Sequence, residues 1–280
     1  MSVAQFTLCG AESKWLIAHC IAKCNMFSPY LGNGRILFKG STTVSCLTRL
    51  LTDTPMRICG RISDKGMKGP LTISDGPHFL LYERGTATDV DICVEETIKS
   101  FGPNDLFITG ANAIDSFGNA ALLIGSPGGG GYGTCMPSLY TEGVRTLILT
   151  GISKHIPGNI SELYSKVSRK DCDFSYGMAC SLAPIPGEVI TEIQAIQYFA
   201  DVEALAFAKG GHTGAEDAVA IQIRGEKEQV EKVLRLIELV KEMPAGPLGE
   251  DASEPECIFP SVNCGQHRSC CYANKHSLLK

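Results

Sequence analysis

The sequence contains no basic stripe and no apolar segment long enough to span a membrane. Its 25 Lys and Arg residues are outnumbered by 30 Asp and Glu residues, which gives a formal net charge of -5 at pH 7. Without a concentrated basic surface, neither nucleic acid nor an anionic membrane is expected as a partner. No apolar stretch approaches the roughly 18 residues that a spanning helix needs. Residues 1–10 lack the basic segment and cleavage pattern of a secretory signal, so a cytoplasmic location is expected.

The chain also lacks an internal repeat and a dinucleotide-binding fingerprint. No Gly-x-Gly-x-x-Gly motif occurs between a strand and a helix with an acidic residue about 20 positions later. The sequence therefore predicts no cofactor.

Paired cysteine motifs are missing as well, although cysteine itself is abundant. The chain has 13 Cys in 280 residues, an odd number in a long chain. This combination argues against a secreted disulfide scaffold and favours buried free thiols in a reducing cytosol.

Alternating strand-like and helix-like segments predict an α/β protein with a mostly parallel sheet flanked by helices. The hydrophobic content of 44% is ample for a buried core. The expected helices cover residues 11–24, 44–51, 92–101, 189–199 and 226–242, with another beginning at 138. The expected strands cover residues 35–39, 56–62, 78–82, 105–109, 120–124, 146–150, 202–207 and 219–223.

The change of pattern near Pro184 predicts three regions. Residues 1–183 are expected to form a Rossmann-like core domain, and residues 184–244 a small α+β domain. Residues 245–280 are rich in Pro, Gly, Ser and Cys, which favours a loosely ordered tail.

The first candidate site is the turn formed by Gly40, Ser41, Thr42 and Thr43, between an expected strand and an expected helix. Small residues at a helix N-terminus direct N–H groups and hydroxyls to one point and favour a bound anion, usually phosphate. The alternative is simple capping of the helix by Ser41 or Thr42.

The second candidate follows the strand that ends at Thr109. Ligands bind at the carboxyl ends of strands in open α/β sheets, so Asn112 and Asp115 are candidate ligand-facing residues. The alternative is an Asx-turn in which both side chains serve the local backbone.

The third candidate is the glycine run that includes Gly128, Gly129 and Gly130. Adjacent glycines carry a high entropic cost and allow the backbone to approach a ligand closely. Lys154, just past another strand, could reach a bound phosphate as a point charge, although a solvated loop lysine is the commoner case.

The tail supplies the fourth candidate, a group of thiols and imidazoles that could bind zinc or an iron–sulfur centre. Their spacing matches no standard Cys-x-x-Cys pair, so no metal ligands are assigned. These residues are Cys257, Cys264, His267, Cys270, Cys271 and His276.

In order, these motifs resemble ribose-5-phosphate isomerase of the A type, over residues 35 to 225. More broadly, they resemble the fold shared by sugar-phosphate isomerases and CoA transferases, which carries a small α+β lid domain. The resemblance implies a phosphate site made by Gly40, Ser41, Thr42, Thr43 and Lys154. The resemblance also implies that Asn112 and the glycines at positions 128–130 line the ligand site.

The family's catalytic acids do not carry over. Thr109 and Asn112 occupy the positions of two family aspartates, and the family's catalytic Glu falls near Met136. Aldose–ketose isomerisation needs a carboxylate base, so Asp115 and Glu142 become the candidate proton-transfer groups.

Three functions are expected. The first is binding of a small phosphorylated metabolite by a divergent isomerase, and the second is the same binding without turnover, in a sensor. The third is a redox or metal module that uses the Cys-rich tail. A homo-oligomer is expected by analogy with the fold alone.

Overall fold

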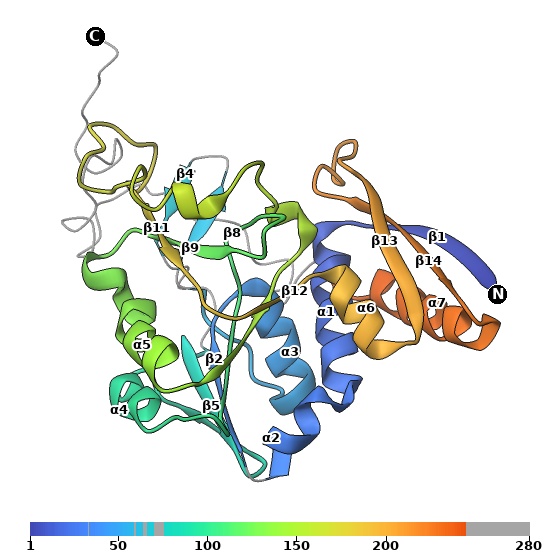
Figure 1. Cartoon of the computed structure of the whole chain (residues 1–280), viewed down its shortest axis with the longest axis horizontal. Helices are drawn as coiled ribbons and strands as arrows, with labels where there is room; N and C mark the ends of the chain where they lie inside the picture. The colour runs from blue at the N-terminus through green and yellow to red at the C-terminus, as the bar shows by residue number, and fades with distance from the viewer. Residues whose placement is uncertain (33, 59, 64–65, 70–75, 245–280) are drawn as a thin grey trace.

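The computed structural model describes the chain except for residues 33, 59, 64–65, 70–75 and 245–280 (Figure 1). Its centre is a six-stranded sheet in the order β12-β10-β7-β2-β5-β6. The four strands from β12 to β2 run parallel, β5 pairs antiparallel with β2, and β6 pairs antiparallel with β5. The α/β class with a mostly parallel sheet is therefore confirmed. The strands are β2 (Arg35–Lys39), β5 (Phe79–Glu83), β6 (Thr86–Asp89), β7 (Leu106–Thr109), β10 (Arg145–Leu149) and β12 (Glu188–Ile190).

Helices cover both faces of this sheet, which explains why its strands read as continuous apolar runs. In β2, Ile36 and Phe38 point into one core and Leu37 into the other, and all three are fully buried. The first core is covered by α1 (Gly10–Lys23), α3 (Thr42–Thr52) and α6 (Glu192–Phe199). The second is covered by α4 (Val94–Lys99) and α5 (Gly130–Thr141).

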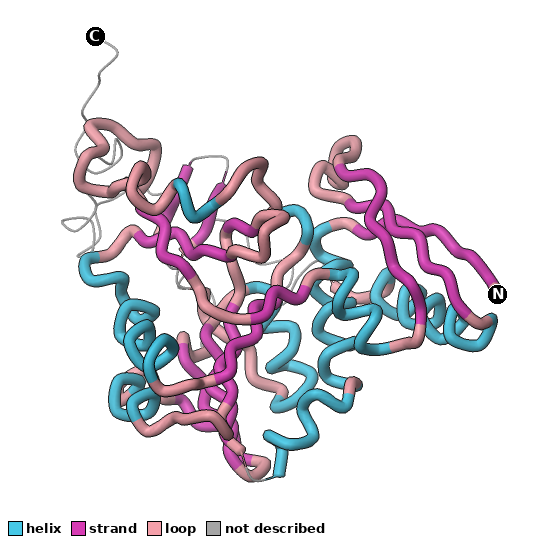
Figure 2. The backbone as a smooth tube through the Cα atoms, in the orientation of Figure 1, coloured by secondary structure: helices cyan, strands magenta, loops and turns pink. Residues whose placement is uncertain are grey.

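A second sheet joins the two ends of the described chain (Figure 2). Its antiparallel order is β1-β14-β13, with α7 packed against it and α1 between it and the large sheet. The strand β1 comes from the predicted core range and the other two strands come from the predicted small-domain range. Their bounds are β1 (Ser2–Leu8), β13 (Val202–Lys209), β14 (Val219–Gly225) and α7 (Lys227–Lys241).

Shorter elements fill the connections. A three-stranded sheet has the order β11-β9-β8, and a hairpin pairs β3 with β4. The short helices are α2 and four 3-10 turns. Their bounds are β3 (Arg61–Ser63), β4 (Gly66–Lys68), β8 (Ala113–Ile114), β9 (Ala120–Ile124), β11 (Ser181–Pro184), η1 (Asn25–Phe27), α2 (Ser28–Gly32), η2 (Pro127–Gly129), η3 (Ile152–Lys154) and η4 (Ile160–Glu162).

Three predicted elements are wrong in the described chain. The helix expected to begin at 138 begins at Gly130 and ends at Thr141, because the glycine run supplies its N-cap and first residues. Residues 56–58 form no strand, because the Met56 N–H is donated to the Ser45 hydroxyl and the Arg57 N–H to the Pro77 carbonyl. The segment 189–199 is not one helix. It begins in β12 and turns into α6 only after Thr191, whose side chain and that of Gln194 form a capping box.

Eight of the cysteines lie in the described chain as free thiols. Cys20, Cys46 and Cys135 are fully buried, and burial raises the pKa of Cys46 and of Cys135 to about 12. Such thiols behave as small apolar core residues. No helix among the described residues is both long and apolar enough to cross a membrane.

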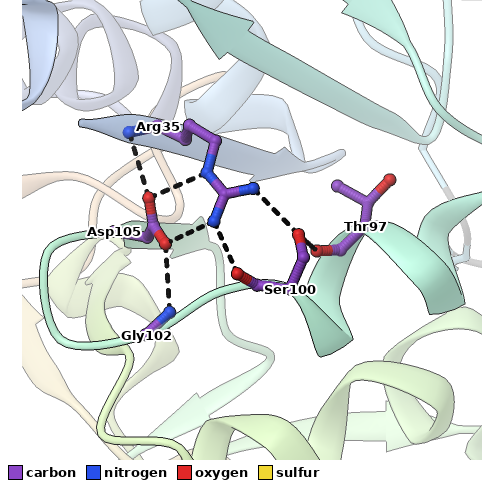
Figure 3. A network of polar contacts seen from close by, with 5 residues as sticks. All are labelled: Arg35, Thr97, Ser100, Gly102 and Asp105. Carbon is purple, nitrogen blue, oxygen red and sulfur yellow. Dashed lines mark hydrogen bonds and ion pairs between the residues drawn. The ribbon is translucent and has the colours of Figure 1, made fainter. Parts of the chain in front are cut away.

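The amino edge of the large sheet is fastened by a bidentate ion pair (Figure 3). Arg35, the first residue of β2, donates to both carboxylate oxygens of Asp105 at 3.0 and 2.7 Å. Asp105 also accepts the backbone N–H groups of Arg35 and Gly102, and the guanidinium reaches the carbonyl and hydroxyl of Ser100. This network holds the start of β2 beside the loop that enters β7.

Replacing Asp105→Ala should lower the free energy of unfolding by about 2–4 kcal/mol, because the substitution leaves a guanidinium and two N–H groups without their acceptor. Urea denaturation would measure the change. Glu95→Ala breaks an exposed i,i+4 pair with Lys99 and should have no measurable effect. Equal effects of the two substitutions would contradict the assigned role.

Candidate functional site

The carboxyl edge of the parallel strands is where the sequence predicted a site, and α3 begins there directly after β2. Ser41 caps this helix: its Oγ accepts the Val44 N–H at 3.2 Å. The capping alternative for Ser41 is therefore the one that the geometry supports. Within the described chain, the N–H groups of Thr42 and Thr43 form no hydrogen bond, since the Ser41 cap satisfies only the Val44 N–H of the first turn.

Close packing joins the turns that follow β2 and β7. A Cβ on Gly110 would lie 2.6 Å from the Ser41 Oγ, so only glycine allows this approach. A Cβ on Gly40 would lie 2.1 Å from the Arg57 carbonyl oxygen. Gly110 thus brings the predicted segments around residues 40 and 110 into contact, and Gly40 brings the first of them against Arg57.

Two lysines at this edge influence each other electrostatically. Lys154, in η3 after β10, is an exposed residue, yet its pKa is lowered by partial desolvation of the ammonium group and, to a smaller degree, by the charge of Lys14, while Asp217 opposes the shift. Burial raises the pKa of Cys46 in α3, and Lys14 opposes that rise, so Lys14 lies near both α3 and Lys154. The edge thus carries two ammonium groups whose charges act on each other, on the side of the sheet where α1 packs against α3.

Glu192 is a buried carboxyl group at the same edge, only 1% exposed. Burial raises the pKa of Glu192 and the charge of Asp217 adds to the rise, against hydrogen bonds from the Ile152 N–H and the Ser13 side chain. Glu192 therefore connects the starts of α6, η3 and α1. Perturbed carboxyl groups at strand ends are candidates for proton transfer.

A further buried cation lies on the opposite face of the sheet. Lys39, the last residue of β2, is 6% exposed and forms no ion pair within the described residues. Phe79 is paired with Lys39 on the neighbouring strand β5, and its ring packs against Gly131. A Cβ on Gly131 would lie only 2.7 Å from that ring. Lys39 therefore lies close to the glycine-rich start of α5.

Asp115 has a structural role. Its carboxylate accepts the backbone N–H groups of Phe117, Asn119 and Ile160 and the side-chain amide of Asn119, at 2.8–2.9 Å. Burial favours the neutral acid, but these hydrogen bonds outweigh it and lower the pKa of Asp115. A carboxylate saturated in this way is poorly suited to accept a substrate proton.

The other predicted polar residues are not brought together either. Asn112 accepts the Leu123 N–H at 3.0 Å and so stabilises the approach of β9. Glu142 is exposed at the end of α5 and accepts from Thr141. Since β10 starts just after it, Glu142 lies at the amino edge of the sheet, away from Ser41 and Lys154.

The glycine run begins α5 and is not a linker. Gly128, Gly129 and Gly130 have φ values of 63°, 84° and 57°, which only glycine adopts readily. A Cβ on Gly133 would lie 1.8 Å from the Gly128 carbonyl oxygen, so the turn folds tightly onto the helix.

Sequence reasoning missed Ser13, Lys14, Glu192 and Asp217. The sequence contains little indication of these residues, since the two lysines are 140 positions apart. Asp217 is tied to the start of α1 by a hydrogen bond that it accepts from the Gly10 N–H at 2.9 Å. The described residues include no group of three or more side chains suited to a metal. The tail cysteines and histidines proposed as ligands lie outside the described residues.

Comparison with protein-family models, curated proteins and solved structures gave no match. The site therefore has to be interpreted from its own geometry.

Asp115→Asn should lower the free energy of unfolding by about 2–4 kcal/mol. The N–H₂ group of the new side-chain amide would face N–H groups that now donate to the Asp115 carboxylate. Thermal or urea unfolding would measure the loss. Asp89→Asn is the matched control, since the exposed Asp89 accepts one N–H, from Asp91. A stable Asp115→Asn protein would contradict the structural assignment.

Glu192→Gln should become more stable relative to the unmodified protein as pH rises from about 4, near the unfolded glutamate pKa, to neutrality. The folded pKa of Glu192 is raised, so the fold favours the neutral acid and the cost of ionisation appears with increasing pH. Urea denaturation across this range would show it. A difference that is constant or reversed in sign would contradict the prediction.

Proposed function

We propose that the protein binds a small phosphorylated metabolite at the carboxyl edge of the six-stranded sheet. The observation that carries this proposal is the electrostatic coupling of Lys14 and Lys154: desolvation and, after it, the charge of Lys14 lower the pKa of Lys154. A bound dianion would relieve the repulsion and accept charge-assisted hydrogen bonds from both ammonium groups.

The start of α3 supports the same ligand. The helix is 11 residues long, its first turn presents the N–H groups of Thr42 and Thr43, and the charge of Lys14 acts on Cys46 in the same helix. The positive end of its dipole adds to the field of the two lysines. The tight contact of Gly110 with Ser41 holds this helix start in a fixed position.

Binding without turnover is the better supported form of this function. Asp115 is occupied by four N–H donors, and Glu142 lies at the other edge. Neither meets the requirement that a base reach the proton it removes.

Proton transfer is a second candidate function, and Glu192 is the observation that favours it. Its raised pKa means that the fold favours the protonated acid, the form that can donate a proton. If turnover of ribose 5-phosphate is detected, Glu192→Gln should abolish it while the ligand still binds.

Titration calorimetry with ribose 5-phosphate and with inorganic phosphate tests the binding proposal. Lys154→Ala should weaken the binding of ribose 5-phosphate by about tenfold or more, since a charge-assisted hydrogen bond to the ligand is lost. Lys23→Ala is the matched control, because Lys23 is exposed at the other end of the helix that carries Lys14. Affinity should fall as pH rises through the lowered pKa of Lys154, because the ammonium loses its charge. Absence of binding by either ligand, or equal affinity in Lys154→Ala, would refute the proposal.

A further inference from the structure

A groove of about 690 Å³ lies on the outer side of α5, apart from the edge described above. One wall is the face of α5 from Gly129 through Met136 to Tyr140. The opposite wall is the segment 164–170 together with β11. Lys14, Lys39 and Lys154 do not line it, so the groove is independent of the proposed phosphate site.

The glycine turn leaves one end of this groove bare of side chains. Nothing lies within 4 Å of the positions that a Cβ on Gly128 or Gly129 would occupy. Their positive φ values fix the backbone of the wall. The end of the groove is therefore built from main chain, which a ligand can approach closely.

The charged residues of the groove are all basic. Arg169 and Lys170 line it, and none of the described lining residues is acidic. This contrasts with a chain in which acidic residues exceed basic ones, 30 to 25. The exposed Lys170 therefore offers its positive charge to a negatively charged ligand in the groove.

The rest of the lining is aromatic and aliphatic. Tyr140 is 51% exposed, so its ring is available to a ligand, and Tyr164 faces the same space. Met136, Val167 and Leu182 add apolar surface. Volumes of this size, mostly apolar with a few polar groups, are typical of small-molecule sites.

We infer that the groove binds a small organic anion with an aromatic or apolar body. The anionic group lies toward Lys170 and the body lies against Tyr140 and Met136. The tyrosines remain neutral donors, because burial raises the pKa of both Tyr140 and Tyr164.

Fluorescence titration with anilinonaphthalenesulfonate tests this, with phenylnaphthylamine as the same body without the sulfonate. Lys170→Ala should weaken binding of the sulfonate probe by about fivefold, which corresponds to one exposed charge contact. The affinity of this variant for the neutral probe should be unchanged. Tyr140→Ala should weaken both probes by about fivefold, the value of one aromatic contact. Lys170→Arg should retain binding.

Lys166→Ala is the matched control, because Lys166 is exposed in the same segment and does not line the groove. Lys154→Ala and excess inorganic phosphate should not change sulfonate binding, so a failure here is distinct from a failure at the sheet edge. The inference is overturned if the sulfonate does not bind, or if either Lys170→Ala or Tyr140→Ala binds it as the unmodified protein does.

Discussion

Burial of β2 on both faces is the constraint on which the rest of the structure depends. The strand is hydrogen-bonded to parallel β7 on one side and antiparallel β5 on the other. Its side chains alternate between two separate cores, so helices must cover both faces of the sheet. Its two ends carry different chemistry: Arg35 is neutralised by Asp105, whereas Lys39 forms no ion pair within the described chain.

The same arrangement decides where charge gathers. The chain leaves β2 through α3 on one face and, after β7, returns through α5 on the other. Adjacent parallel strands whose connections diverge in this way create a ligand-binding crevice at their carboxyl ends. Lys14 and Lys154 lie on the α3 side of the sheet and Lys39 on the α5 side. The two proposed ligands therefore belong to different faces of one scaffold, with α5 separating the groove from the sheet.

Local patterns in the sequence predicted what is locally determined. The apolar periodicity of α1 and α7, the buried run of β2 and the cap at Ser41 all depend on neighbouring residues. The pairing of β1 with β14 and the meeting of Lys14 with Lys154 depend on contacts between distant segments, which carry no periodic signal. For Asp115 the local pattern is misleading, because an acid in a predicted loop resembles a catalytic group. Its structural role depends in part on the N–H group of Ile160, which is 45 positions away in the sequence.

The pairing of Ser2 with Gly225 has a consequence for biosynthesis. The backbone groups of β1 find their strand partners only when β14, the last described strand, has been synthesised. Until then, the apolar side of β1, which includes Phe6 and Leu8, has no sheet to join. Contacts of such high sequence separation slow folding and leave a newly made chain open to chaperone capture. This β-sheet is thus completed only after the residues of β14 have been synthesised.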